Sequence, residues 1–156
     1  MTRLTLLAMA AVLAGGVGIA ADARPARNPG DTVTLQITVT GVRNAKGFVH
    51  VDICRQAEFL KSCPVQTKAV AVAGTTVVTI ANLSPGTYAA QVFHDENNNT
   101  KVDRALFGIP KEGVGFSNDA PIKLSPPKWG DAHFELTDDK AITLKLRYFM
   151  GGGARR

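Results

Sequence analysis

The chain has few of the residues that mark the common kinds of catalytic or metal site. Its 156 residues include only two cysteines, one tryptophan and two tyrosines, and aromatic residues make up 6% of the total. Two cysteines without a Cys-x-x-Cys pair are too few for a structural zinc centre and form no redox motif. No Gly-x-Ser-x-Gly or Gly-Lys-Ser/Thr segment is present, so neither a nucleophile elbow nor a phosphate-binding loop is predicted.

Positive charge is concentrated at the two ends of the chain. The formal net charge is +5 at pH 7, and Arg24, Arg27, Arg155 and Arg156 account for most of it. No basic stripe with interleaved aromatic residues occurs between them, so the sequence does not predict a nucleic-acid-binding surface. The terminal arginines are interpreted as solubilising tails, with weak attraction to an anionic membrane surface as the alternative.

The N-terminal segment has the organisation of an export signal. Arg3 precedes the uncharged run Leu4–Ala21, and Ala21-Asp22-Ala23 is a small-x-small cleavage site. We therefore predict a signal peptide over residues 1–23, a linker over 24–31, and a periplasmic or secreted protein with no stable membrane span after cleavage. The alternative is a retained anchor, because the run is at the lower limit of a spanning length.

Export changes the interpretation of the two cysteines. Cys54 and Cys63 lie nine positions apart, and no third thiol competes for either of them. In an oxidising compartment such an even pair predicts a disulfide, which would close a short loop containing Glu58 and Phe59.

Most of the predicted mature chain shows the two-residue periodicity of half-buried strands, and no segment of it shows convincing helical periodicity. We predict one all-β domain over residues 32–149, an antiparallel β-sandwich of about seven strands of the immunoglobulin or prealbumin-like type, followed by a flexible tail over 150–156. The strand segments are 32–40, 49–54, 67–72, 75–81, 87–94, 131–137 and 141–149. The predicted core positions are Leu35, Ile37, Val51, Tyr88, Val92, Leu144 and Leu146.

Residues 95–130 form a segment that is too long for an idle connection in a compact domain, which predicts a functional loop. It contains Phe107 and Phe116 and ends just after Trp129. We interpret these three aromatic residues as anchors that pin the loop to the core, with an exposed aromatic platform for a ligand as the alternative.

The start of this loop carries oxygen-bearing side chains at alternate positions, as in a calcium loop. Calcium prefers six to eight hard oxygen ligands. The predicted ligands are Asp95, Asn97, Asn99 and Asp103 through their side chains, Lys101 through its carbonyl, and the more distant Glu112. The match to an EF-hand is incomplete, because Thr100 and Leu106 stand where that motif has Gly and Glu. A polar turn in which Asn and Asp satisfy their own backbone remains an equal alternative.

Three separated segments resemble an uncharacterised family of exported bacterial proteins, the domain of unknown function 2141. They are Phe93–Asn99, Gly108–Asn118, and Trp129 with Asp131-Ala132. The resemblance implies a secreted or periplasmic β-sandwich over about 33–149, with no assigned reaction. The family's loop often has Gly where Asn98 or Thr100 stands here. The segment Leu83–Tyr88 also resembles the turn that enters a strand in transthyretin-like and carboxypeptidase-regulatory-like sandwiches, where the Tyr packs a corner of the fold.

Together these features favour a non-enzymatic binding module of the cell envelope with a calcium-binding loop. Its expected partner is an envelope protein or a glycan. The competing hypothesis is a small metal-dependent hydrolase that uses the carboxylates of Asp95, Asp103 and Glu112.

Overall fold

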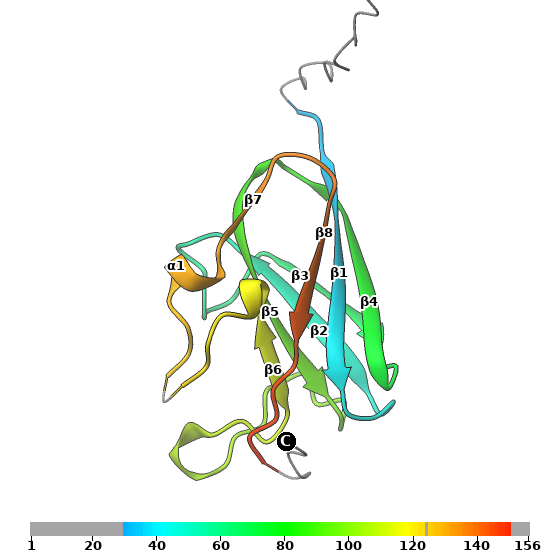
Figure 1. Cartoon of the computed structure of the whole chain (residues 1–156), viewed down its shortest axis with the longest axis vertical. Coiled ribbons are helices and arrows are strands. Elements are labelled where there is room, and N and C mark those ends of the chain that lie inside the picture. The colour runs from blue at the N-terminus through cyan, green and yellow to red at the C-terminus, as the bar shows by residue number, and fades with distance from the viewer. Residues whose placement is uncertain (1–29, 124, 151–156) are drawn as a thin grey trace, which may run out of the picture.

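A computed structural model describes residues 30–123 and 125–150, which fold into two β-sheets with almost no helix (Figure 1). The predicted signal peptide, all of the linker up to residue 29 and the tail from 151 lie outside the described residues. The described part contains eight strands, two short 3-10 segments, and one helical turn, α1 (Trp129–Ala132). None of its helical segments has the length and apolar character needed to cross a membrane.

The first sheet has the strand order β4-β1-β8, formed by Gly74–Leu83, Val33–Val42 and Lys140–Lys145. Strand β1 is antiparallel to β4 but parallel to β8, so the prediction of a purely antiparallel fold is wrong. The cause is a crossover: after β7 (Phe134–Leu136), which pairs with the second sheet, the chain passes over the top of the molecule and enters β8 beside β1 (Figure 1).

The second sheet is antiparallel and has the order β3-β2-β5-β6, with β7 paired to the start of β5. Its strands are β3 (Val65–Val70), β2 (Phe48–Cys54), β5 (Gly86–Asp95) and β6 (Gly113–Phe116).

Strand β6 is absent from the sequence prediction and brings the total to eight rather than about seven. Its inward positions are Gly113 and Gly115, and its apolar residues, Val114 and Phe116, face outward. A strand of four residues with glycine on its inward face lacks the usual pattern of apolar inward and polar outward positions. A Cβ atom on Gly113 would lie 2.4 Å from Cζ of Tyr148, and one on Gly115 would lie 2.8 Å from the Lys145 carbonyl oxygen. The glycines therefore allow β6 to approach the C-terminal segment closely. Of the predicted strand 131–137, only 134–136 forms a strand, because 131 and 132 belong to α1.

The main hydrophobic core lies between the two sheets and draws residues from both of them. Alternate positions of β1, β2, β5 and β8 point inward, as their two-residue periodicity predicts. All seven predicted core positions are buried, which confirms the strand faces: Leu35, Ile37, Val51, Tyr88, Val92, Leu144 and Leu146.

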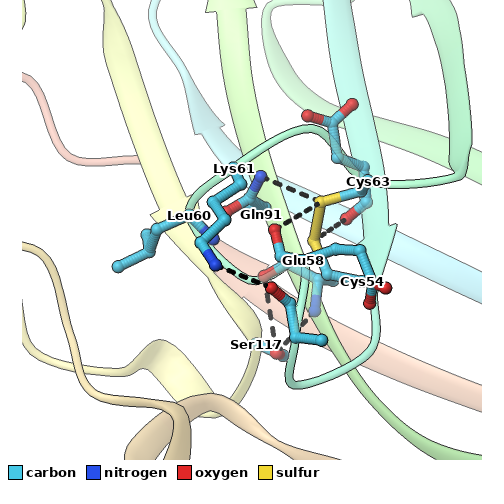
Figure 2. Close-up of a disulfide and its surroundings, with 10 residues drawn as sticks. Cys54, Glu58, Leu60, Lys61, Cys63, Gln91 and Ser117 are labelled. Carbon is cyan, nitrogen blue, oxygen red and sulfur yellow. Dashed lines mark hydrogen bonds between the residues drawn. A yellow bond between two sulfur atoms is a disulfide. The ribbon is translucent and has the colours of Figure 1, made fainter.

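A second, smaller cluster covers one end of the outer face of the second sheet. The predicted disulfide is confirmed, with the Cα atoms of Cys54 and Cys63 4.8 Å apart (Figure 2). Phe59 from the disulfide loop packs edge-on against Phe116 and Trp129, with ring centroids 6.0 and 5.6 Å away. Phe116 and Trp129 therefore act as anchors, as predicted.

Candidate functional site

The loop that follows β5 turns tightly around the carboxylate of Asp95, which is completely buried. Asp95 Oδ1 accepts a hydrogen bond from the Asn99 N–H at 3.0 Å, and Oδ2 accepts one from the Thr100 N–H at 2.8 Å. Asn98 and Thr100 both adopt left-handed backbone conformations, with φ of 60° and 65°. Thr100 thus takes the conformation that an EF-hand assigns to glycine at the equivalent position, although left-handed φ is unusual for a β-branched residue.

Glu112 reaches back to the same loop from the residue before β6. It is 4% exposed, and its two carboxylate oxygens accept hydrogen bonds from the backbone N–H groups of Glu96 (3.2 Å) and Asp103 (3.1 Å). Burial raises the pKa of Glu112, and the negative charges of Asp95 and Asp103 raise it further against these two hydrogen bonds. Three carboxylates therefore share one small region, and the charges of Asp95 and Asp103 act unfavourably on that of Glu112.

The remaining predicted ligands are engaged with one another. The amide Nδ2 groups of Asn97 and Asn99 donate to the carboxylate of Asp103, at 2.7 and 3.0 Å. Their Oδ1 atoms accept hydrogen bonds from the backbone N–H groups of Asn99 and Lys101. This is the bonding of a self-satisfied polar turn. No group of three or more His, Cys, Asp or Glu in the described part of the chain has a spacing that would hold a metal ion.

Two histidines that the sequence pattern leaves isolated lie at the base of the loop. His94 is fully buried; its Nε2 lies 2.8 Å from the Lys46 carbonyl oxygen and its Nδ1 lies 2.8 Å from the Tyr148 hydroxyl. Because a carbonyl only accepts, Nε2 carries a proton; in the neutral ring Nδ1 then accepts a hydrogen bond from the Tyr148 hydroxyl. His50 stacks on Phe93, and its Nε2 lies 3.2 Å from Asp95 Oδ2. Burial lowers the pKa of His50, although the charge of Asp95 opposes this.

A pocket of about 750 Å³ lies on the outer face of the second sheet, and we call it the outer pocket. Its floor is formed by outward-facing positions of three neighbouring strands: Asp52 of β2, Gln91 and Phe93 of β5, and Val114 and Phe116 of β6. Strand pairing places Asp52 opposite Gln91 and Gln91 opposite Phe116, so the floor is a continuous row across the sheet.

Three loops make the walls of the outer pocket. The disulfide loop contributes Leu60 and Lys61, and the Leu60 N–H donates to Gln91 Oε1 at 3.1 Å (Figure 2). The segment 102–110 forms a second wall, and Ile122 lies in the third. Asp52 on the floor has a raised pKa because it is buried, although a hydrogen bond from Gln91 and the charge of His50 oppose the shift.

The prediction that Phe107 anchors the loop on the core is wrong. Phe107 is 99% exposed instead of anchored on the core, and its backbone is left-handed with φ of 63°. Its neighbour Leu106 is 82% exposed. Phe107 therefore exposes its ring to solvent and does not pin the loop to the core. The alternative interpretation of the loop as an exposed aromatic platform therefore describes Phe107 better.

Residues 37–144 match the model of a family described as "uncharacterized protein conserved in bacteria (DUF2141)". The chain belongs to this family. The matched range contains every predicted calcium ligand, the disulfide and the floor of the outer pocket. No curated protein and no solved structure matches the chain. The family description assigns no activity.

Proposed function

We propose that this DUF2141 protein is an exported, non-enzymatic binding module of the cell envelope whose loop 95–103 binds calcium. The observation that carries the proposal is the convergence of Asp95, Asp103 and Glu112 on one tight loop. Carboxylates crowded in this way repel one another, and a cation between them would remove that repulsion. Hard oxygen ligands at flexible distances suit calcium better than magnesium, which demands strict octahedral geometry.

Calcium would change the bonding of two amides in the loop. Asn97 and Asn99 now present their Nδ2 groups to Asp103, and a cation would require them to present oxygen instead. The carboxylates would also have to move closer together, because no group of three acids in the described part of the chain has a spacing that holds a metal ion. Each oxygen that accepts one N–H still has a free lone pair for a cation. Lys101 would contribute its backbone carbonyl. The need to break two amide hydrogen bonds argues for weak, extracellular-type affinity, with a Kd on the order of 10⁻⁴ to 10⁻³ M.

A non-enzymatic module is favoured over a metal-dependent hydrolase because two of the three acids are buried and already hydrogen-bonded. Asp95 and Glu112 are buried, and both oxygens of each already accept backbone hydrogen bonds. A general acid or base needs access to a substrate proton, and these two carboxylates are instead used to shape the loop.

We extend the proposal to a prealbumin-like β-sandwich, a location in the periplasm or outside the cell, and an envelope protein or glycan as partner. Two sheets with a shared core support the sandwich class. Tyr88 adds support, because it packs in that core and its hydroxyl donates to the Ser84 carbonyl oxygen at 2.8 Å, closing a corner at the turn into β5. The disulfide supports an oxidising compartment.

Calcium titration by calorimetry, paired with thermal melts, tests the proposal. With a Kd of about 1 mM, about 10 mM calcium would stabilise the fold by about 1.4 kcal/mol, which raises the Tm by roughly 5 °C for a domain of this size. Asp103→Asn keeps the shape of the side chain but removes one charge, and it should abolish most of that rise. Glu135→Gln is the matched control, since Glu135 is an exposed acid on β7. No heat of binding and no Tm change in the unmodified protein would reduce the loop to a polar turn.

A further inference from the structure

The outer pocket has the dimensions and lining of a site for one small apolar ligand. Its volume of about 750 Å³ lies within the range of roughly 300–1,000 Å³ that is usual for such sites. Apolar side chains come from both floor and walls: Leu60, Val102, Phe107, Ile109, Phe116 and Phe149. Phe107 lines the pocket and is otherwise uncovered, so a bound apolar chain would bury surface that the protein itself leaves in water.

The pocket is lined by positive charges near its entrance and by one negative charge on its floor. Lys61, Arg104 and Lys123 are exposed and come from three different walls, whereas Asp52 is a half-buried acid on the floor. A ligand anion would be attracted to the outer cations and repelled by the deep carboxylate, so its charge would stay near the entrance. The complementary molecule has an apolar body and one anionic end.

We propose that the outer pocket binds a free long-chain carboxylate. Its alkyl chain would pack against the apolar lining formed by Phe107, Ile109 and Phe116, and its carboxylate would lie near Lys61, Arg104 and Lys123. The concave shape favours single molecules over the surface of a bilayer, because the floor lies behind three loops that a flat membrane would not enter. Val102 of the loop 95–103 and its neighbour Arg104 line the pocket. The ligand would use none of the acids proposed for calcium, so its binding does not depend on calcium.

The wall that carries Phe107 is pre-shaped for this role. Backbone hydrogen bonds close the segment at two levels, from the Lys111 N–H to the Asp103 carbonyl and from the Ala105 N–H to the Ile109 carbonyl, each at 2.8 Å. The Arg104 guanidinium also donates to the Gly108 carbonyl oxygen at 2.8 Å. A ligand would therefore meet an ordered wall, and the ordering of that wall would subtract little from the binding free energy.

Calorimetry on the full mature chain, with dodecanoate below its aggregation concentration as the probe, tests the assignment. We expect saturable binding with a stoichiometry near one. Dodecyl maltoside, which has the same chain and no charge, should bind severalfold more weakly, because it lacks the charge that the three exposed cations attract. Butyrate, which has the charge and almost no chain, should show no binding. Equal affinity for the neutral and the anionic amphiphile would overturn the assignment of the headgroup.

Two pairs of variants locate the site. Phe107→Ala should weaken dodecanoate binding about tenfold, from the apolar burial that it removes, while Leu106→Ala should leave the affinity unchanged. Both residues are exposed and neighbouring, but only Phe107 lines the pocket. Lys123→Gln should weaken dodecanoate binding severalfold, and Lys128→Gln, outside the pocket, should not. Since all four side chains are exposed, the fold should survive each change.

Three results would overturn the proposal. One is the absence of dodecanoate binding at submillimolar concentration by a chain whose melt shows that it is folded. Another is equal loss in the Phe107 and Leu106 variants. The third is binding to anionic phospholipid vesicles in place of monomeric dodecanoate, which would make the loop a membrane contact. Failure of the calcium proposal would instead appear as an unchanged melt with added calcium, whatever the result with dodecanoate.

Discussion

Gly47 offers a direct test of how the loop 95–103, the proposed calcium site, is attached to the fold. It lies in the turn between β1 and β2, with φ of +66°, directly below the start of the loop. A Cβ atom added there would lie 1.8 Å from the backbone carbonyl oxygen of Asp95 and 2.9 Å from its carbonyl carbon. Both partners are backbone atoms, so no side-chain rotation can relieve the contact.

The cost of Gly47→Ala has two parts that can be separated. A left-handed backbone costs an L-residue about 1–2 kcal/mol, and forcing atoms into an occupied space typically costs about 1–3 kcal/mol more. Gly74→Ala is the matched control, because Gly74 has φ of +88° but nothing lies within 4 Å of the position that its Cβ atom would occupy. We expect losses of unfolding free energy of about 2–5 kcal/mol for Gly47→Ala and about 1–2 kcal/mol for Gly74→Ala.

Urea unfolding of the three proteins measures these losses. The Gly47 variant should also lose calcium-dependent stabilisation if calcium binds, because the Asp95 backbone must move. Equal losses of unfolding free energy in the two variants would refute the reasoning, since the close approach of Gly47 to Asp95 would then add nothing to the destabilisation.

Three further predictions address other parts of the fold. Replacing Cys54 and Cys63 together by Ser should lower the unfolding free energy by about 3 kcal/mol, measured by urea unfolding, because the disulfide restricts the unfolded chain; an unchanged midpoint would contradict this. Tyr148→Phe should cost about 1–3 kcal/mol by leaving buried His94 Nδ1 without a donor, and a neutral result would place that nitrogen in contact with water. Burial raises the pKa of Asp52, so Asp52 binds a proton more tightly in the folded protein than in the unfolded chain. The contribution of Asp52 to stability therefore falls as the pH rises from about 3.8, its ordinary pKa, through its pKa in the folded protein. Asp52→Asn should remove that decline in melts taken across the acid range, and an identical pH profile would show that Asp52 is not desolvated.

The strand faces can be predicted from the sequence because burial alone imposes the alternation. Leu35 and Ile37 can be placed in the core without knowledge of any partner strand, since each strand has one inward face. Strand direction is a different kind of information. Nothing in the pattern of Ile142 and Leu144 distinguishes a parallel from an antiparallel neighbour, so the parallel β1–β8 pairing is visible only in the structure.

The two parts of the candidate site also differ in how far the sequence predicts them. The loop from Asp95 is predictable because its ligand-type residues are close in sequence and because its length is unusual. The sequence also predicts contact of Glu112 with that loop, and the structure brings it there. The outer pocket is not predictable in this way, because its parts are far apart: Asp52 and Gln91 belong to faces that sequence periodicity assigns to solvent, and only the sheet register joins them.

Phe107 departs from its prediction for a physical reason that the structure makes clear. A phenylalanine in a long loop is usually buried, because exposure forfeits the free energy of removing its ring from water. The outward position of Phe107 is explained by the residue that follows it. Gly108 has a left-handed backbone, with φ of +75°, which allows the chain to reverse direction at the tip of the loop. An apolar pair ahead of a glycine at the tip of a closed turn is the sequence signal that could suggest an outward side chain.

One continuous segment, 95–112, contributes to both proposed sites, and its hydrogen bonds explain how an exposed tip can stay ordered. At its base, Asp103 donates its N–H to buried Glu112 and accepts the Lys111 N–H through its carbonyl. Above that base, the tip needs only its own short-range bonds to hold Phe107 beside the pocket. Burial of Glu112 is unfavourable for its charge, so the fold loses stability at the base of the loop and gains a fixed wall at the tip. Such a cost is expected where a binding surface has to be presented in one conformation before its ligand arrives.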